Sequence, residues 1–384
     1  MNTVTATRLH AADVNITMIS NTPAVTDYAR RYFGSWWNAF EVLPASVCAE
    51  PVVFADIDAD QYATLQALVE TCPHEKTTYA KAATLVARDT EGTITAVSPT
   101  QQLAYRHEPA TGRLSVIGTE SEPVALAAAR IARDAMRGLL LRDGWTLLHA
   151  SAVTDNCRTV LTFGEKGAGK TTTALALANL GWQLLANDRI FVRPDEGGQL
   201  RVLPWPSAAA IGLGLLDALG WHDVARKRLE AGEALHPTQH PEVTDAVLAG
   251  RREPLWEPGG KRERKVQVYP DQFAHWFGLK LATGGLAQVV LFPRIRRDAT
   301  PAVEGCRRTL GDADFMHGAT EDRYSDILGL APAAEAEAAT PGRASPTTST
   351  SCPSTPWSSA TTWRQMPPSC TGCSASRPQA PAGR

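Results

Sequence analysis

The stretch from Gly164 to Thr171, GEKGAGKT, constrains this chain of 384 residues more than any other feature. It matches the pattern G-x-x-x-x-G-K-[ST] at every fixed position. Small residues at this spacing let successive backbone N–H groups point inward at a phosphate, and the helix that follows adds its positive end. An apolar run, TVLTF, precedes the loop, and a helix-forming run, TTTALALANL, follows it. The sequence therefore predicts a strand, a phosphate-binding loop and a helix in this order.

The side chains of the loop have distinct expected roles. Lys170 is expected to reach the β- and γ-phosphates of a nucleotide, and the Thr171 hydroxyl is expected to ligate Mg²⁺. A glycine-rich turn without a ligand is the alternative, and the flanking strand and helix patterns disfavour it. The residues expected to bind the nucleotide are Gly164, Glu165, Lys166, Gly167, Ala168, Gly169, Lys170, Thr171 and Thr172.

An Asn-Asp pair follows at the end of the next apolar run. The run WQLLAND places Asp188 eighteen residues after Lys170. A helix of about ten residues spans roughly 15 Å, so the chain can return along the sheet and bring Asp188 back beside the loop. An acid at this point can hold the metal of a bound nucleotide or take a proton from a substrate. The amide of Asn187 can do neither as a base.

The segment from His149 to Val192 resembles the catalytic core of the HPr kinase/phosphorylase family. These P-loop proteins share their architecture with ATP-dependent phosphoenolpyruvate carboxykinases. The family shows a His, two strands, the phosphate loop, a helix and a strand that ends in two consecutive acids. In this chain His149 and the pair Asn187-Asp188 occupy the outer positions of that pattern. The close match covers about forty-five residues, whereas downstream similarity is only topological and the first hundred residues lack it.

The resemblance implies an α/β fold with a PEP carboxykinase-like P-loop domain. It gives Lys170 and Thr171 their phosphate and metal roles, and it places Asp188 near the metal. His149 matches the residue that lines the phosphate-transfer site. Asn187 departs from the family, because it stands where the first acid acts as base toward the substrate hydroxyl and an amide cannot accept that proton.

The implied activity is Mg-ATP-dependent phosphorylation of a hydroxyl, with Asp188, His149 and Lys170 as catalytic residues. The acceptor would be a serine of a protein or peptide, or a small metabolite, in a peptide-modification or secondary-metabolite pathway. In this interpretation Asp188 serves both the metal and the hydroxyl, since phosphoryl transfer depends mostly on positioning and charge. The alternatives are a nucleotide-binding regulatory protein without transfer and a defective product of a frameshifted gene. The resemblance also implies a homo-oligomer.

Residues 1–120 predict a smaller N-terminal α/β domain. The runs DVNITMISN and EPVVFADI are typical of strands, and TPAVTDYARRYF and DADQYATLQALVE of helices. The runs that follow, up to RLSVIG, indicate an antiparallel meander. A helix is expected from Ser121 to Arg142, and it opens the P-loop domain assigned to residues 121–330.

Composition excludes several classes of partner. A net charge of −2 provides no global field for nucleic acid or a membrane surface, and the chain shows neither a signal peptide nor an apolar run that could span a bilayer. The seven cysteines lack the spacing of a disulfide framework. These features predict a cytoplasmic protein with no nucleic-acid and no membrane partner. The basic loop KRERK (261–265) either closes over phosphates or forms a solvated charged hairpin.

Residues 331–384 differ from the rest of the chain. No Leu, Ile or Val occurs after Leu330, and no Asp or Glu occurs after Glu337. Such a segment cannot bury enough apolar surface to offset its ordering entropy, so it is expected to be disordered. One hypothesis is an out-of-frame translation that replaces a final helix or strand, and a natural flexible tail is the alternative. Cys370 and Cys373 lack the partner pair that a metal site needs.

Overall fold

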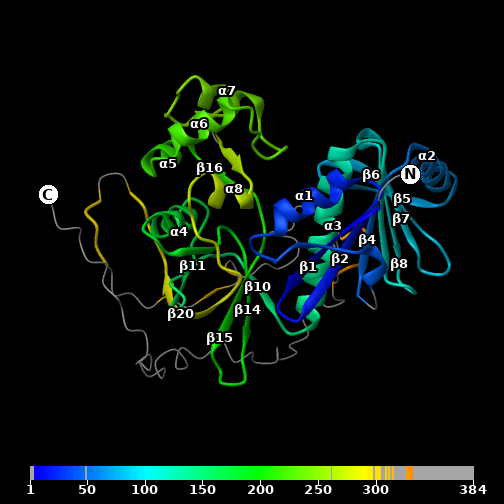
Figure 1. Ribbon diagram of the computed structural model, residues 1–384, viewed down its shortest axis with the longest axis horizontal. Coiled ribbons are helices and arrows are strands. Elements are labelled where there is room, and N and C mark those ends of the chain that lie inside the picture. The colour runs from blue at the N-terminus through cyan, green and yellow to red at the C-terminus, as the bar shows by residue number, and fades with distance from the viewer. Residues whose placement is uncertain are drawn as a thin grey trace, which may run out of the picture.

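A computed structural model describes residues 4–47, 50–260, 262–296, 299–303, 308, 310, 311, 314 and 326–331. These residues form a mixed α/β protein with two large sheets (Figure 1). Within this part of the chain no helix is long and apolar enough to cross a membrane. Beyond Ala331, the prediction for the C-terminal tail falls outside the described residues.

The first sheet is built from residues 5–118 in the order β3-β1-β2-β4-β9-β8-β7-β6-β5. Its strands are β1 (Thr5–Ala11), β2 (Val14–Ser20), β3 (Phe40–Val42), β4 (Val52–Ile57), β5 (His74–Tyr79), β6 (Ala82–Arg88), β7 (Ile94–Ser98), β8 (Leu103–Glu108) and β9 (Arg113–Gly118). Strands β5 to β9 pair antiparallel in sequence order, which confirms the predicted meander. Strands β2 and β9 run parallel to β4 between them.

Helices cover both faces of this sheet. They are α1 (Pro23–Phe33), α2 (Ala59–Thr71) and α3 (Ser121–Arg142), with single 3₁₀ turns η1 (Pro44–Ser46) and η2 (Pro99–Gln101) between strands. Helices α1 and α3 share one core with β2 and β4, whereas α2 packs on the other face through Tyr62, Leu65 and Val69. Helix α3 has the predicted bounds, and it contacts α1, β2, β4 and β9 far more than it contacts the second sheet. Its assignment to the P-loop domain stays a prediction.

The second sheet carries the phosphate loop and has the order β10-β14-β15-β20-β12-β11-β13. Its strands are β10 (Thr146–Leu148), β11 (Ser151–Thr154), β12 (Thr159–Thr162), β13 (Gln183–Ala186), β14 (Ile190–Pro194), β15 (Leu200–Pro204) and β20 (Gly285–Leu291). The pattern of the run TLLHASAV predicts a single strand before the strand TVLTF, and this prediction is wrong, because the run forms the two strands β10 and β11. Strand β10 pairs with β14, whereas β11 pairs with β12 and β13, so the chain crosses the sheet at His149.

Short helices and strands lie above helix α4 (Lys170–Asn179) in Figure 1. They are α5 (Leu213–Ala218), α6 (His222–Glu230), α7 (Pro241–Leu248), α8 (Pro270–His275), β16 (Ala209–Ile211), β17 (Leu255–Trp256), β18 (Glu263–Arg264) and β19 (Val266–Val268). All of these elements except β18 contribute residues to one apolar core with α4, or pack against it. In the basic loop, Arg264 pairs with Glu242 of α7 and Arg262 lies 4.0 Å from Glu257, which fits a charged hairpin. Lys261 lies outside the described residues.

Two consecutive tryptophans after α1 join the two sheets. The indole Nε1 of Trp36 donates to the carbonyl of Leu184 in β13 at 3.3 Å, and that of Trp37 donates to the carbonyl of Pro204 in β15 at 3.0 Å. Trp36 is 1% exposed and Trp37 is 0% exposed. The first sheet therefore contributes core residues to the region that carries the loop.

Replacing Trp37 by Ala should lower the free energy of unfolding by about 3–5 kcal/mol, because it leaves a large cavity in the core. The exposed Trp256 supplies a matched control, and Trp256→Ala should change that free energy by less than about 0.5 kcal/mol. Urea unfolding followed by circular dichroism measures both. Equal effects of the two substitutions would contradict this packing.

Candidate nucleotide site

The phosphate loop between β12 and α4 has a backbone that requires glycine. Gly164, Gly167 and Gly169 have φ of 152°, 88° and 107°, a region that other residues rarely adopt. A Cβ on Gly164 would lie 2.8 Å from the Cβ of Ala168, and one on Gly169 would lie 2.4 Å from Cδ1 of Ile295. The loop is thus packed against its own turn at Ala168 and against Ile295 in the segment after β20. A side chain at Gly164 would displace the turn, and one at Gly169 would displace Ile295.

Lys170 is the first residue of α4, and only 8% of it is exposed. Its Nζ donates to the carbonyl of Gly164 at 2.7 Å and lies 3.4 Å from the carbonyl of Glu165. Ser151 of β11 donates to the backbone carbonyl of Lys170 at 2.9 Å and fixes the start of the helix. The ammonium group therefore lies against the loop backbone, where a phosphate would also lie.

The start of α4 contacts the end of β13. Thr171 Oγ1 donates to the backbone carbonyl of Asn187 at 3.2 Å. Asn187 is 4% exposed, and its Oδ1 accepts a hydrogen bond from Ser207 Oγ at 3.3 Å. The structure thus brings together the hydroxyl and the Asn-Asp pair that the sequence singles out, and it turns the amide of Asn187 toward Ser207.

Asp188 lies between two basic side chains. His149 Nε2 is 3.3 Å from its Oδ1, and Arg189 Nε is 3.4 Å from its Oδ2. The Asp188 side chain is 45% exposed, which leaves room for a ligand. His149 comes from the link between β10 and β11, where its backbone N–H donates to the carbonyl of Asp314 at 3.0 Å and not to the sheet. Breaking the predicted single strand is what places this histidine beside Asp188.

The pKa of Asp188 is lower than that of an ordinary aspartate. Desolvation is the largest effect and raises the pKa, but the hydrogen bond from His149 and the charges of Arg189, His149 and Lys170 together outweigh it. Asp188 is therefore ionised at neutral pH. A carboxylate of this kind suits a cation, and it is a weak base toward a hydroxyl.

The arrangement fits a metal held jointly with a nucleotide and not a dedicated metal centre. Among the described residues, no group of three or more His, Cys, Asp or Glu side chains could hold an ion. Mg²⁺ in nucleotide sites needs only one or two carboxylates, with the phosphates and water as its other ligands. The Thr171 hydroxyl and the Asp188 carboxylate, on adjoining parts of the loop and β13, meet that requirement.

Arg189 and Trp205 are further neighbours of the site. The sequence did not point to Arg189, and the position of Trp205 between two prolines favoured packing. The Arg189 guanidinium lies over the Trp205 ring at 5.6 Å, and the guanidinium of Arg133 from α3 lies 5.0 Å from the same ring. Arg189 directly follows Asp188, and this adjacency is the signal that could have identified it. Nothing in the sequence pattern places Arg133 here, because its contact with Trp205 depends on how the two sheets pack.

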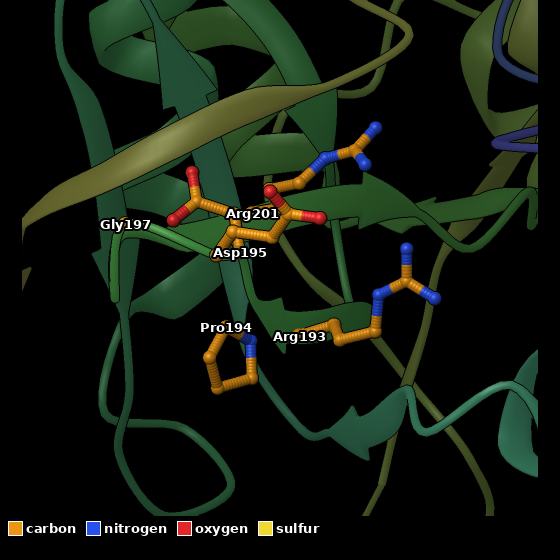
Figure 2. Close-up of a pocket in the computed structure, with 6 residues that line it drawn as sticks. Arg193, Pro194, Asp195, Gly197 and Arg201 are labelled. Atoms are coloured by element: carbon orange, nitrogen blue, oxygen red, sulfur yellow. The ribbon is translucent and has the colours of Figure 1, made fainter.

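A separate hollow of about 540 Å³ lies at the turn between β14 and β15 (Figure 2). Its side chains spread from the hairpin in Figure 2 and do not converge on one point. Arg193 is already paired with Asp143 and stacked on Trp145. The residues that line the hollow are Arg193, Pro194, Asp195, Glu196, Gly197 and Arg201. None of them belongs to the phosphate loop, so this hollow is separate from the candidate nucleotide site.

Comparisons with known proteins find matches among solved structures. No protein-family model matches the chain, and no curated protein does. Among solved structures, the HPr(Ser) kinase/phosphatase from Coxiella burnetii is 33% identical over 15% of this chain, with a TM-score of 0.14. The match covers 34% of the Coxiella protein, so this chain spans about a third of that structure. A TM-score this low does not establish a shared fold.

Asp188 should make stability depend on acid pH. Its folded-state pKa is lowered, so its contribution is complete above the ordinary aspartate pKa of about 3.9 and is lost as pH falls through the folded value. We compare the free energy of unfolding of the native protein with that of Asp188→Asn, measured by urea unfolding between pH 5 and pH 2. The native protein should lose its advantage over Asp188→Asn as the pH falls. In a His149→Ala background the decrease should be smaller, because removing His149 raises the folded-state pKa of Asp188 toward the ordinary value. If the difference in unfolding free energy between the native protein and Asp188→Asn grew toward acid pH, the folded-state pKa of Asp188 would not be lowered.

Proposed function

We propose that this chain is a Mg-ATP-dependent phosphotransferase that phosphorylates a hydroxyl group. The observation that carries the proposal is the contact between Thr171 Oγ1 and the carbonyl of Asn187, 3.2 Å apart. It sets the first turn of the loop helix against the strand that ends in Asp188. A phosphate-binding backbone, a lysine, a hydroxyl and an ionised carboxylate then adjoin one another, which is the set that phosphoryl transfer requires.

Each residue has a role that follows from its position. The loop amides and Lys170 would hold the phosphates, and Thr171 with Asp188 would hold Mg²⁺, which neutralises charge on the transferring group when bound. His149, 3.3 Å from Asp188, would orient that carboxylate and lie near the acceptor. Asp188 would then serve both the metal and the hydroxyl, and positioning and charge neutralisation would contribute more than a strong base.

The proposed acceptor is a serine of a protein or peptide, or a small metabolite, in a peptide-modification or secondary-metabolite pathway. The proposal also includes action in the cytoplasm, a PEP carboxykinase-like arrangement of the P-loop domain and assembly into a homo-oligomer. The acceptor, the domain arrangement and the homo-oligomer follow from the resemblance to HPr kinase/phosphorylases, whereas the cytoplasmic location follows from the composition of the chain.

A regulatory protein that binds nucleotide without transferring phosphate is the second candidate. Its support is the side chain of Asn187, which is 4% exposed and hydrogen-bonded by Ser207. An amide at this point cannot take a proton, and the lowered pKa of Asp188 makes its carboxylate a weak base. Both candidates share the nucleotide site, and they differ in turnover.

Nucleotide binding tests what the two candidates share. Lys170→Ala should weaken Mg-ATP binding by about 10- to 100-fold, because it removes a charged donor to the phosphates. Lys76 of β5 lies exposed and outside the phosphate loop, so Lys76→Ala should change the affinity less than about threefold. Isothermal titration calorimetry measures both. Similar losses for the two variants would contradict the assigned role of Lys170.

Turnover separates the candidates. With radiolabelled ATP and a panel of peptide and small-molecule hydroxyl acceptors, the native protein should transfer phosphate, and Asp188→Asn should reduce the rate by at least about 100-fold. Asn187→Asp supplies a neighbouring substitution that adds a carboxylate. Turnover by Asn187→Asp together with none by the native protein would overturn the phosphotransferase proposal and favour the regulatory protein.

A further inference from the structure

A cluster of basic and aromatic side chains adjoins Asp188 through Arg189. We call Arg133, Arg189 and Trp205 the arginine–tryptophan cluster. Trp205 follows β15 and is 2% exposed, and both guanidinium groups lie over its ring at 5.0 and 5.6 Å. The backbone N–H of Trp205 donates to the carbonyl of Arg189 at 3.3 Å. The two arginines, from α3 and from the turn after β13, are therefore held by one aromatic ring.

The cluster connects directly to the candidate site. Arg189 Nε lies 3.4 Å from Asp188, and Arg133 Nη1 lies 3.4 Å from the carbonyl of Pro206. The next residue, Ser207, donates to Asn187 at 3.3 Å. One short segment after β15 thus contacts an arginine of α3 on one side and the Asn-Asp pair on the other.

The first sheet's helices complete this side. The Tyr32 hydroxyl of α1 accepts a hydrogen bond from Arg133 at 3.4 Å and another from the backbone N–H of Ala208 at 3.2 Å. His149, Arg189 and Lys170 act electrostatically on Asp188, and Arg133 is linked to Arg189 through the Trp205 ring.

We propose that the arginine–tryptophan cluster binds an anionic group of the acceptor, a carboxylate or phosphate close to the hydroxyl that is phosphorylated. The proposal rests on the proposed function for the identity of the reacting hydroxyl. Guanidinium groups match carboxylate and phosphate oxygens in planar, paired hydrogen bonds. Stacking on Trp205 fixes the planes of both groups before a ligand arrives, which reduces the entropy lost on binding.

The position of the cluster explains why it would face the acceptor and not the nucleotide. Lys170 lies against the carbonyl of Gly164 in the phosphate loop, and Thr171 lies against the carbonyl of Asn187, so ATP phosphates would lie on this side. His149 lies beside Oδ1 of Asp188, and Arg189 lies beside Oδ2. Arg133, from helix α3, contacts the carbonyl of Pro206 in the segment after β15. The N-terminal part of the chain would thereby contribute a residue to acceptor recognition.

The test uses the full chain loaded with Mg²⁺ and a non-hydrolysable ATP analogue, so that added anions cannot occupy the phosphate loop. Glycerol 3-phosphate, glycerate and glycerol are titrated by calorimetry as phosphate, carboxylate and neutral probes. Arg133→Gln and Arg189→Gln are the test variants, and Arg189→Lys keeps the charge without the planar fork. Arg201→Gln is the matched control, because Arg201 also lies over a tryptophan, Trp145, at 5.7 Å but outside the site.

We expect at least one anionic probe to bind at least 10-fold more tightly than glycerol. Arg133→Gln and Arg189→Gln should each weaken that binding by about 10-fold or more, Arg189→Lys should weaken it less, and Arg201→Gln should leave it unchanged. Preference for glycerol 3-phosphate identifies a phosphate, and preference for glycerate a carboxylate. Equal binding of all three probes, or arginine variants that keep the native melting temperature and the native anion affinity, would overturn the proposal.

This binding measurement does not depend on turnover. Arginine-dependent anion binding without phosphoryl transfer would support an anion site and refute the phosphotransferase. Phosphoryl transfer to neutral acceptors that is insensitive to Arg133→Gln and Arg189→Gln would keep the phosphotransferase and overturn the anion site. A further variant, Trp205→Phe, keeps an aromatic ring under both guanidinium groups and should retain most of the anion affinity.

Discussion

The site depends on one contact, the hydrogen bond from Thr171 Oγ1 to the backbone carbonyl of Asn187. It joins the first turn of α4 to the end of β13, two elements that are separated only by the helix itself and a tight turn. Because the glycine backbone fixes the loop on one side and the sheet fixes β13 on the other, this contact sets where Asp188 lies relative to Lys170. The environment of Asp188, and with it the lowered pKa of its carboxyl group, follows from that position.

The rest of the chain supports this contact from outside the loop. Trp36 donates to a carbonyl of β13, and Trp37 donates to the last carbonyl of β15. Both tryptophans belong to the connection after α1, so the N-terminal sheet holds two strands that lead into the site. Ser207 then links the segment after β15 to Asn187. The two sheets are therefore connected at the site itself, and a nucleotide bound there would meet groups that both sheets hold in place.

The sequence predicted those helices, strands and loops that are specified by residues close together in the chain. The glycines, Lys170 and the runs on either side specified the loop and α4, and the helix from Ser121 to Arg142 has the expected ends. Strand β1 was not predicted, because a polar residue at one of its buried positions obscures the alternation of apolar and polar side chains that is typical of a strand. The break at His149 was missed because its cause is a bond to Asp314, far along the chain. Likewise, Arg133 reaches Trp205 only through the packing of α3 between sheets, which no sequence window contains.

The central claim is that Thr171 and Asp188 jointly hold the metal of a nucleotide bound in the loop. Crystals grown with an ATP analogue and Mn²⁺ in place of Mg²⁺ test it directly, because anomalous scattering locates the ion without assumptions about its ligands. We expect one ion about 2.0–2.4 Å from Thr171 Oγ1, in contact with the Asp188 carboxylate directly or through one water. An ion bound to the nucleotide but remote from both residues, or a nucleotide bound outside the loop, would contradict it.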